Sequence, residues 1–162
     1  VYRWFLFAIL AENKPFFGEN MIEHRQLRSI CHASIGTNDL IQAAAFYTPL
    51  LKILQIDLVS QYQHAVAYGK GYPEFWVQRA FDQGLATVGN GTHFGFVALE
   101  KSQVDDFYQQ ALLLGGKCAG APGSRHEYGE PYYGCFIRDL DGHKIEASFW
   151  DEQLAKDIYS KG

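Results

Sequence analysis

The stretch HASIGTNDLIQAAAFY (residues 32–47) recurs further along the chain as HFGFVALEKSQVDDFY (residues 93–108). Each copy opens on a histidine and reaches a Phe-Tyr pair fourteen positions later. In both copies, alternating residues indicate a strand, and apolar residues at helical spacing then indicate a helix. The shared order of strand, helix and aromatic anchor predicts that the chain contains two copies of one structural unit.

Further strands complete each unit, giving the order strand–helix–strand–strand–strand twice. We predict strands over residues 29–37, 56–60, 64–68 and 74–80, and again over 93–99, 117–121, 132–138 and 144–149. Pro49 lies inside the first predicted helix and is expected to bend or break it. Residues 37–39 and Ser102 are expected to cap the two helices, and Asp141-Gly142 is a hairpin signal.

These elements define an α+β protein with a simple domain organisation. Residues 29–82 and 93–150 form the two modules, residues 83–92 form a glycine-containing linker, and residues 151–162 form a C-terminal helix and tail. Residues 1–28 are an N-terminal extension. Because Met21 is the sole methionine, we expect the natural start near it and an upstream extension over residues 1–20.

The composition excludes several classes of protein. The chain of 162 residues is 48% hydrophobic and 20% charged, which is typical of a globular protein. A net charge of −4 gives no basic surface for nucleic acid or an anionic membrane. Three cysteines without CxxC spacing indicate reduced thiols and a cytoplasmic protein. The longest apolar run, residues 4–11, is far shorter than the ~20 residues of a membrane span.

The two histidines that open the repeats are the first candidates for chemistry. Strand alternation places His32 and Ser34 on the face opposite the helix of their module, and His93 on the corresponding face of the other module. Glu146 in the last strand is expected on that same face. If the two sheets join, two imidazoles and one carboxylate converge, a set that suits divalent Fe, Zn, Ni, Co or Mn with coordination positions left open. The alternative is that these histidines are ordinary surface residues.

Two further groups of residues could complete the site. Aligning residues 76–78 with residues 144–146 puts Gln78 opposite Glu146, where it is either a fourth metal ligand or a plain polar strand residue. Trp76 shares its predicted face with Gln78 and is either a wall of the pocket or a core residue. The loop over residues 120–133 carries Arg125 for a substrate anion and His126 or Tyr128 as acid or base. Ser34 and Tyr133 are expected to contact substrate. The alternative for the loop is a solvated segment whose aromatic rings pack at the rim.

With the closing run FIRDLDGHKIE (residues 136–146), the repeat resembles the vicinal-oxygen-chelate superfamily over roughly residues 29–150. That superfamily includes glyoxalase I, extradiol dioxygenases, fosfomycin-resistance transferases and bleomycin-resistance proteins. The resemblance implies two tandem βαβββ modules forming an incomplete curved barrel around a divalent metal, with His32, His93 and Glu146 at ligand positions. Gln78 stands where glyoxalase I commonly has Glu, which leaves one carboxylate at the centre.

The resemblance implies a metal-dependent enzyme that chelates a small substrate through adjacent oxygens. Its chemistry would be that of a lyase or isomerase, with Glu146 as base, or of a dioxygenase. The alternatives are a metal-free sequestering protein of the bleomycin-resistance type and a thiol transferase acting on a small electrophile. The expected partners are a small molecule and, because short pairs of modules leave sheet edges exposed, a second copy in a homodimer.

Overall fold

The computed structural model describes residues 30–159. The chain divides into two units, residues 1–31 and 32–162, and every helix and strand described below belongs to the second unit. The proposed extension before Met21 lies outside the described residues. Among residues 30–159, no helix is long and apolar enough to span a membrane.

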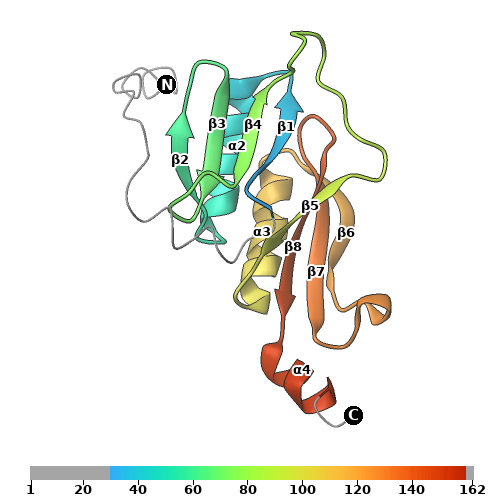
Figure 1. Cartoon of the computed structure of the whole chain (residues 1–162). Coiled ribbons are helices and arrows are strands. Elements are labelled where there is room, and N and C mark those ends of the chain that lie inside the picture. The colour runs from blue at the N-terminus through green and yellow to red at the C-terminus, as the bar shows by residue number, and fades with distance from the viewer. Residues whose placement is uncertain (1–29, 160–162) are drawn as a thin grey trace. The chain divides into compact units, whose positions relative to one another are not determined.

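The first module is a four-stranded sheet with one long helix. Its elements are β1 (Ala33–Thr37), α2 (Leu40–Lys52), β2 (Asp57–Gln61), β3 (Ala65–Gly69) and β4 (Phe75–Arg79) (Figure 1). The strand order is β1-β4-β3-β2, in which β1 runs parallel to β4 and the remaining pairs are antiparallel. A parallel pair needs a crossover, which α2 and the β2–β3 hairpin provide.

The second module repeats this arrangement. It comprises β5 (His93–Val97), α3 (Lys101–Leu113), β6 (Lys117–Gly123), β7 (Tyr132–Arg138) and β8 (Lys144–Trp150), in the order β5-β8-β7-β6. A 3₁₀ turn η1 (His126–Tyr128) precedes β7, and helix α4 (Glu152–Tyr159) follows β8. The predicted α+β fold with two βαβββ modules is confirmed. Within residues 30–159 no ladder joins the two sheets, so the barrel is not closed in a single chain.

Several local predictions differ from the structure. β1 begins at Ala33, so His32 directly precedes the strand. Asp39 caps α2 as expected, accepting hydrogen bonds from two backbone N–H groups, and the helix continues through Pro49. The expected cap at Ser102 is wrong. Helix α3 begins at Lys101, and the side-chain oxygen of Gln103 instead accepts a hydrogen bond of 2.7 Å from the Leu99 N–H.

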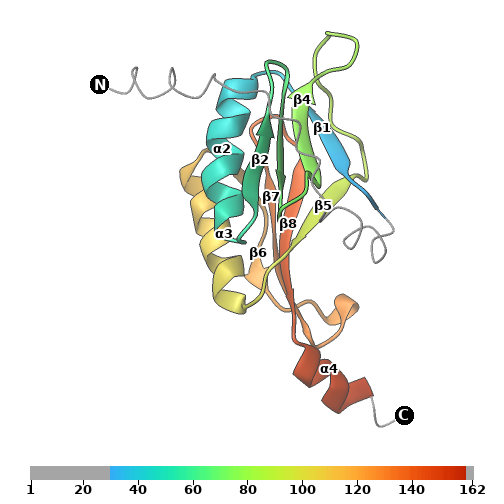
Figure 2. The same ribbon diagram turned by 60° about the vertical axis from the view of Figure 1, so that its left-hand side comes forward.

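Both long helices cover the same side of the sheets. Figure 2 shows α2 and α3 along the left-hand side of the view with the strands of both sheets to their right, and the two helices are in contact. The core lies between these helices and the sheets, where Ile35 and Val77 of the first module and Phe96 and Ile145 of the second are buried. The predicted helix-facing side of β1 and β5 is therefore confirmed. The opposite side of each sheet, here called its open face, is left uncovered by α2 and α3.

The turn between β7 and β8 ties the second module to the first. Buried Asp139 accepts a hydrogen bond of 2.6 Å from the Tyr47 hydroxyl on α2. Buried His143 lies with Nε2 2.7 Å from the Gly36 carbonyl oxygen, to which it donates because a carbonyl can only accept. The Asp141 carboxylate also accepts hydrogen bonds from Thr37 and Asn38. This network fixes the start of β8, and with it Glu146, relative to the first module.

Candidate functional site

Glu146 and His93 meet on the open face of the second sheet. In the parallel β5–β8 ladder, Gly95 is the partner of Glu146. An added Cβ at Gly95 would lie 3.3 Å from Glu146 Oε2, so the glycine leaves the space that the carboxylate occupies. Glu146 Oε2 lies 3.2 Å from His93 Nε2, and the two side chains are 11% and 45% exposed respectively. The pair is therefore anchored in the sheet and reachable from solvent.

Tyr132 holds the second oxygen of Glu146. Its hydroxyl donates a hydrogen bond of 2.7 Å to Glu146 Oε1. The ring lies across Gly134, where an added Cβ would come within 2.1 Å of the Tyr132 hydroxyl oxygen, so only glycine fits there. Burial, and after it the hydrogen bond to Glu146, raises the pKa of Tyr132 above its ordinary value. The phenol thus remains a proton donor at neutral pH, and it leaves Oε2 directed toward His93.

The spacing of the two donor atoms is suitable for a shared metal ion. With metal–ligand bonds of about 2.0–2.2 Å, nitrogen and oxygen ligands are separated by about 2.9 Å at an octahedral angle and about 3.4 Å at a tetrahedral angle. The 3.2 Å between His93 Nε2 and Glu146 Oε2 lies between these values. Neutral imidazole and carboxylate are also ligands that Fe(II), Zn and Mn accept. The same distance equally allows a direct ion pair when His93 is protonated.

His32 is not part of this pair. It is exposed at the residue before β1. Among the residues that the structure describes, no three His, Cys, Asp or Glu side chains are grouped so as to hold a metal. A single chain therefore brings together two of the three expected ligands, His93 and Glu146, and not the third.

The open face of the first sheet differs from that of the second. The β1–β4 ladder pairs Ser34 with Trp76 and Gly36 with Gln78. Counting from the two histidines, Ser34 corresponds to Gly95, so Trp76 and not Gln78 stands at the position of Glu146. The sequence alignment that placed Gln78 opposite Glu146 is thus two residues out of register. The Trp76 ring stacks on Tyr62, with 6.1 Å between centroids and 18° between planes.

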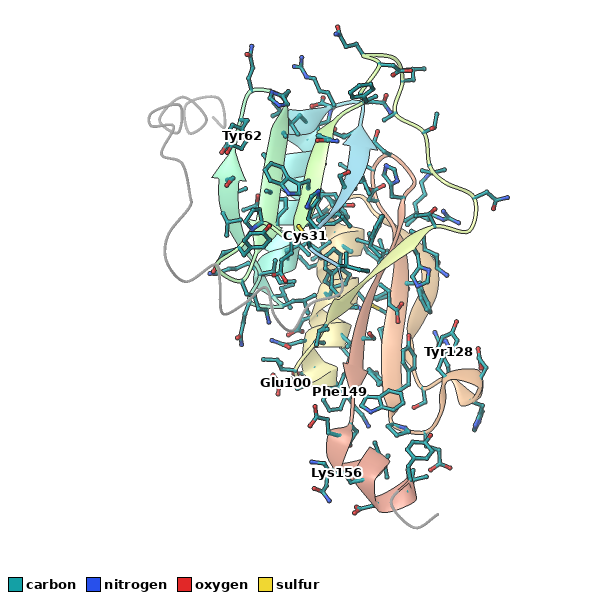
Figure 3. All side chains as sticks on the ribbon, viewed as in Figure 1. Cys31, Tyr62, Glu100, Tyr128, Phe149 and Lys156 are labelled. Atoms are coloured by element: carbon teal, nitrogen blue, oxygen red, sulfur yellow. The ribbon has the colours of Figure 1, made fainter. Side chains whose placement is uncertain are left out.

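The loop candidates lie around Tyr132. Arg125 directly precedes η1, and its guanidinium donates hydrogen bonds to the carbonyl oxygens of Ala121 and Ser124. His126 and Tyr128 lie on η1 and are exposed. The Tyr128 ring packs edge-on against Tyr132, with 5.0 Å between centroids, and Figure 3 shows Tyr128 on the turn beside β7. The loop thus borders the open face of the second sheet.

Tyr133 lies on the other side of the sheet from Glu146. Its hydroxyl donates a hydrogen bond of 2.8 Å to Asp105 on α3, and its ring packs against the core. The residue that reaches Glu146 is its neighbour Tyr132, which the sequence analysis did not select. The antiparallel β7–β8 register pairs Phe136 with Glu146. Counting back in steps of two from Phe136 reaches Tyr132, so this register was the signal that could have found it.

Comparisons with known proteins agree with this description of two tandem βαβββ modules. The profile of the Glyoxalase/Bleomycin resistance protein/Dioxygenase superfamily matches residues 29–147. A crystal structure of a glyoxalase/bleomycin resistance protein from Albidiferax ferrireducens T118 is 30% identical and has a TM-score of 0.69. The match covers 75% of this chain and 98% of that one. A glyoxalase-related enzyme from Fulvimarina pelagi is 18% identical with a TM-score of 0.59, over 76% of this chain and 88% of that one, and shares the fold. No curated protein matches the sequence.

The fold and the site define a class of proteins that are built from tandem βαβββ modules and carry a histidine–carboxylate pair on one open face. The chain belongs to the Glyoxalase/Bleomycin resistance protein/Dioxygenase superfamily.

Proposed function

We propose that this protein is a metal-dependent enzyme that binds a small substrate through two adjacent oxygens. The observation that carries the proposal is the His93–Glu146 pair, whose donor atoms lie 3.2 Å apart on an open face. Tyr132 and Gly95 shape the position of the carboxylate. A divalent ion held there would supply Lewis-acid stabilisation of negative charge on the substrate oxygens.

We further propose that His32 of a second copy completes the site. His32 occupies in the first module the position that His93 occupies in the second. Within the described part of one chain, however, His32 does not form a three-residue metal-binding group with His93 and Glu146. Strands β1 and β5 are both unpaired edges of their sheets within the described residues. Edges of this kind invite pairing with another chain. A two-fold dimer would place the first module of one copy against the second module of the other, which creates two equivalent sites.

The chemistry of the site would depend on a single central carboxylate. Trp76 stands at the first-module position that corresponds to Glu146, so that position offers no second acid. Two imidazoles and one carboxylate leave coordination positions for both substrate oxygens. If Glu146 acts as the base that transfers a proton, the site would perform isomerase or lyase chemistry. If Glu146 stays a metal ligand and another coordination position of the metal is open, the site would perform dioxygenase chemistry. His126 and Tyr128, exposed on η1, are the proposed acid–base groups of the loop.

Metal content tests the proposal. The full chain, purified without chelator, is expected to bind about one divalent ion per chain, measured by inductively coupled plasma mass spectrometry and by titration with Mn²⁺, Ni²⁺ and Zn²⁺. His93→Ala and Glu146→Gln should each lower the affinity by at least about tenfold. His64→Ala is the matched control, because His64 is an exposed histidine that stacks on Tyr62 in the other module. A wild-type chain that binds none of these ions would refute the metal-dependent function.

A second candidate function is metal-free binding of an aromatic compound, as a sequestering protein would perform. The observation that favours it is the stack of His64, Tyr62 and Trp76 on the open face of the first sheet, in which Tyr62 is 44% exposed. Aromatic ligands stack on such surfaces. Under this candidate Trp76→Ala would abolish ligand binding by the metal-free chain, whereas His93→Ala would leave it unchanged.

A further inference from the structure

Two cationic side chains gather on Phe136, at the centre of the second sheet's open face. The Lys144 ammonium lies over the Phe136 ring, with 4.0 Å between Nζ and the ring centroid. The guanidinium of Arg125 lies near the opposite flank, because an added Cβ at Gly120 would be 3.0 Å from the Phe136 ring and 3.5 Å from Arg125 Nη2. Both charges therefore lie on the face that carries Glu146.

Neither cation has a carboxylate partner among residues 30–159. Within the described part of the chain, Arg125 donates hydrogen bonds only to the backbone carbonyl oxygens of Ala121 and Ser124, and the Lys144 ammonium contacts the Phe136 ring. Among the described residues Glu146 is not an ion-pair partner of either cation, and its two oxygens contact Tyr132 and His93 instead. Backbone carbonyls and an aromatic ring hold a cation in position without cancelling its charge. The result is a positive region in a chain whose net charge is −4.

This positive region borders the proposed metal ligands. Lys144 is the ladder partner of His93, whose ring packs edge-on against Phe136 with 6.1 Å between centroids. Phe136 is in turn the ladder partner of Glu146. A small molecule with oxygens at His93 and Glu146 would thus extend across Phe136 toward Arg125 and Lys144.

We propose that Arg125 and Lys144 bind an anionic group of the substrate, a carboxylate or a phosphoryl group, beside the His93–Glu146 pair. The inference rests on the proposed function, since it names the substrate class of the same site. Charge-assisted hydrogen bonds from Arg125 and a point charge from Lys144 would bind the anion. The apolar Phe136 surface between them would contact the carbon skeleton.

The test uses the full chain, freed of metal so that binding at the anion site is measured alone, and two probes that share a 2-oxo acyl group but differ in charge. Pyruvate is anionic and methyl pyruvate is neutral. Binding is followed by chemical-shift changes of backbone amides in NMR spectra. Pyruvate should bind about tenfold more tightly than methyl pyruvate, with the shifts centred on β7 and β8. A parallel titration with acetate and methylphosphonate identifies whether the carboxylate or the phosphoryl group is preferred.

Arg125→Gln and Lys144→Met should each remove the preference for pyruvate, and Lys144→Arg should retain it. Lys101→Met is the matched control, because Lys101 also lies over an aromatic ring, that of Tyr133, on the helix side of the same sheet. Equal binding of the two probes by the wild-type chain, or an equal loss in the Lys101 control, would overturn the inference. Mn²⁺ titration of the same variants tests the metal site separately. A chain that prefers pyruvate but binds no metal would refute the proposed function and retain the anion site.

Discussion

Replacing Tyr132 by phenylalanine removes one atom and isolates the support of Glu146. The hydroxyl donates a hydrogen bond of 2.7 Å to Glu146 Oε1, and Tyr132 is only 7% exposed. Hydrogen bonds to charged groups contribute about 1.5–3 kcal/mol to stability, and an acceptor left unsatisfied in the interior accounts for much of that cost. Because the Glu146 side chain keeps 11% exposure, water can partly replace the phenol, and the lower part of this range applies.

We therefore expect Tyr132→Phe to lower the free energy of unfolding by about 1.5–2 kcal/mol, measured by urea denaturation. For a chain of this size that corresponds to a decrease in Tm of about 3–8 °C. Mn²⁺ affinity should fall by about 10–100-fold, because residues that orient a metal ligand typically contribute that much. Fluorescence or calorimetric titration of the folded variant provides the second readout.

Tyr128→Phe is the matched control for this experiment. The Tyr128 ring packs against Tyr132, but its hydroxyl makes no hydrogen bond to the residues that the structure describes, and the residue is 50% exposed. Its loss should change the free energy of unfolding by less than about 0.5 kcal/mol. Unchanged stability and unchanged metal affinity in Tyr132→Phe would refute the positioning of Glu146 by Tyr132. An equal effect in both variants would show that the loss does not come from the hydrogen bond between Tyr132 and Glu146.

Three further substitutions test the surroundings of the site. Gly134→Ala should abolish the Tyr132–Glu146 hydrogen bond, because its Cβ would overlap the phenol, so its Tm should fall at least as far as that of Tyr132→Phe. Gly95→Ala should weaken Mn²⁺ binding with a small loss of stability, because its Cβ must displace Glu146 Oε2 by only a few tenths of an ångström. Burial raises the pKa of Asp139 above 3.8; the hydrogen bond from Tyr47 and the contacts with His143 oppose this shift, and Asp141 adds to it. Asp139 therefore keeps its proton to a higher pH in the folded chain than in the unfolded chain, which increases the free energy of unfolding at low pH. This added stability is lost as the pH rises above 3.8. The difference in free energy of unfolding between the native chain and Asp139→Asn, measured by urea denaturation, should accordingly narrow as pH rises. If the difference in free energy of unfolding widens as the pH rises, the pKa of Asp139 is not raised in the folded chain.

The two modules could be predicted from sequence because their signals are local and occur twice. The spacing from His32 to Tyr47 recurs from His93 to Tyr108, and α2 and α3 begin at matching positions. Helical spacing also outweighed the break signal of Pro49, since the buried side of α2 is held by the core. Ser102 was misassigned as a cap because Gln103 reaches back to Leu99, a contact that residue preference alone does not specify.

The candidate site was harder to predict because it depends on register between strands. Tyr132 and Tyr133 are adjacent and chemically alike, and only the β7–β8 pairing determines which one reaches Glu146. Strand register also explains why the sequence alignment assigned Gln78 to the position that corresponds to Glu146, which Trp76 occupies in the β1–β4 ladder. The position of His32 relative to His93 depends on how modules associate, which no spacing within one chain encodes.

The proposed metal site is shared between two copies of the chain, and mixing two variants that each bind metal weakly tests it most directly. His32→Ala and His93→Ala should each bind Mn²⁺ weakly when pure. After joint unfolding and refolding of equal amounts, a mixed dimer would combine His32 of one chain with His93 and Glu146 of the other. Random pairing makes about half of the dimers mixed, each with one intact site, so tight Mn²⁺ binding should return to about one quarter of the wild-type stoichiometry. A mixture that binds no more tightly than the separate variants would contradict the shared site.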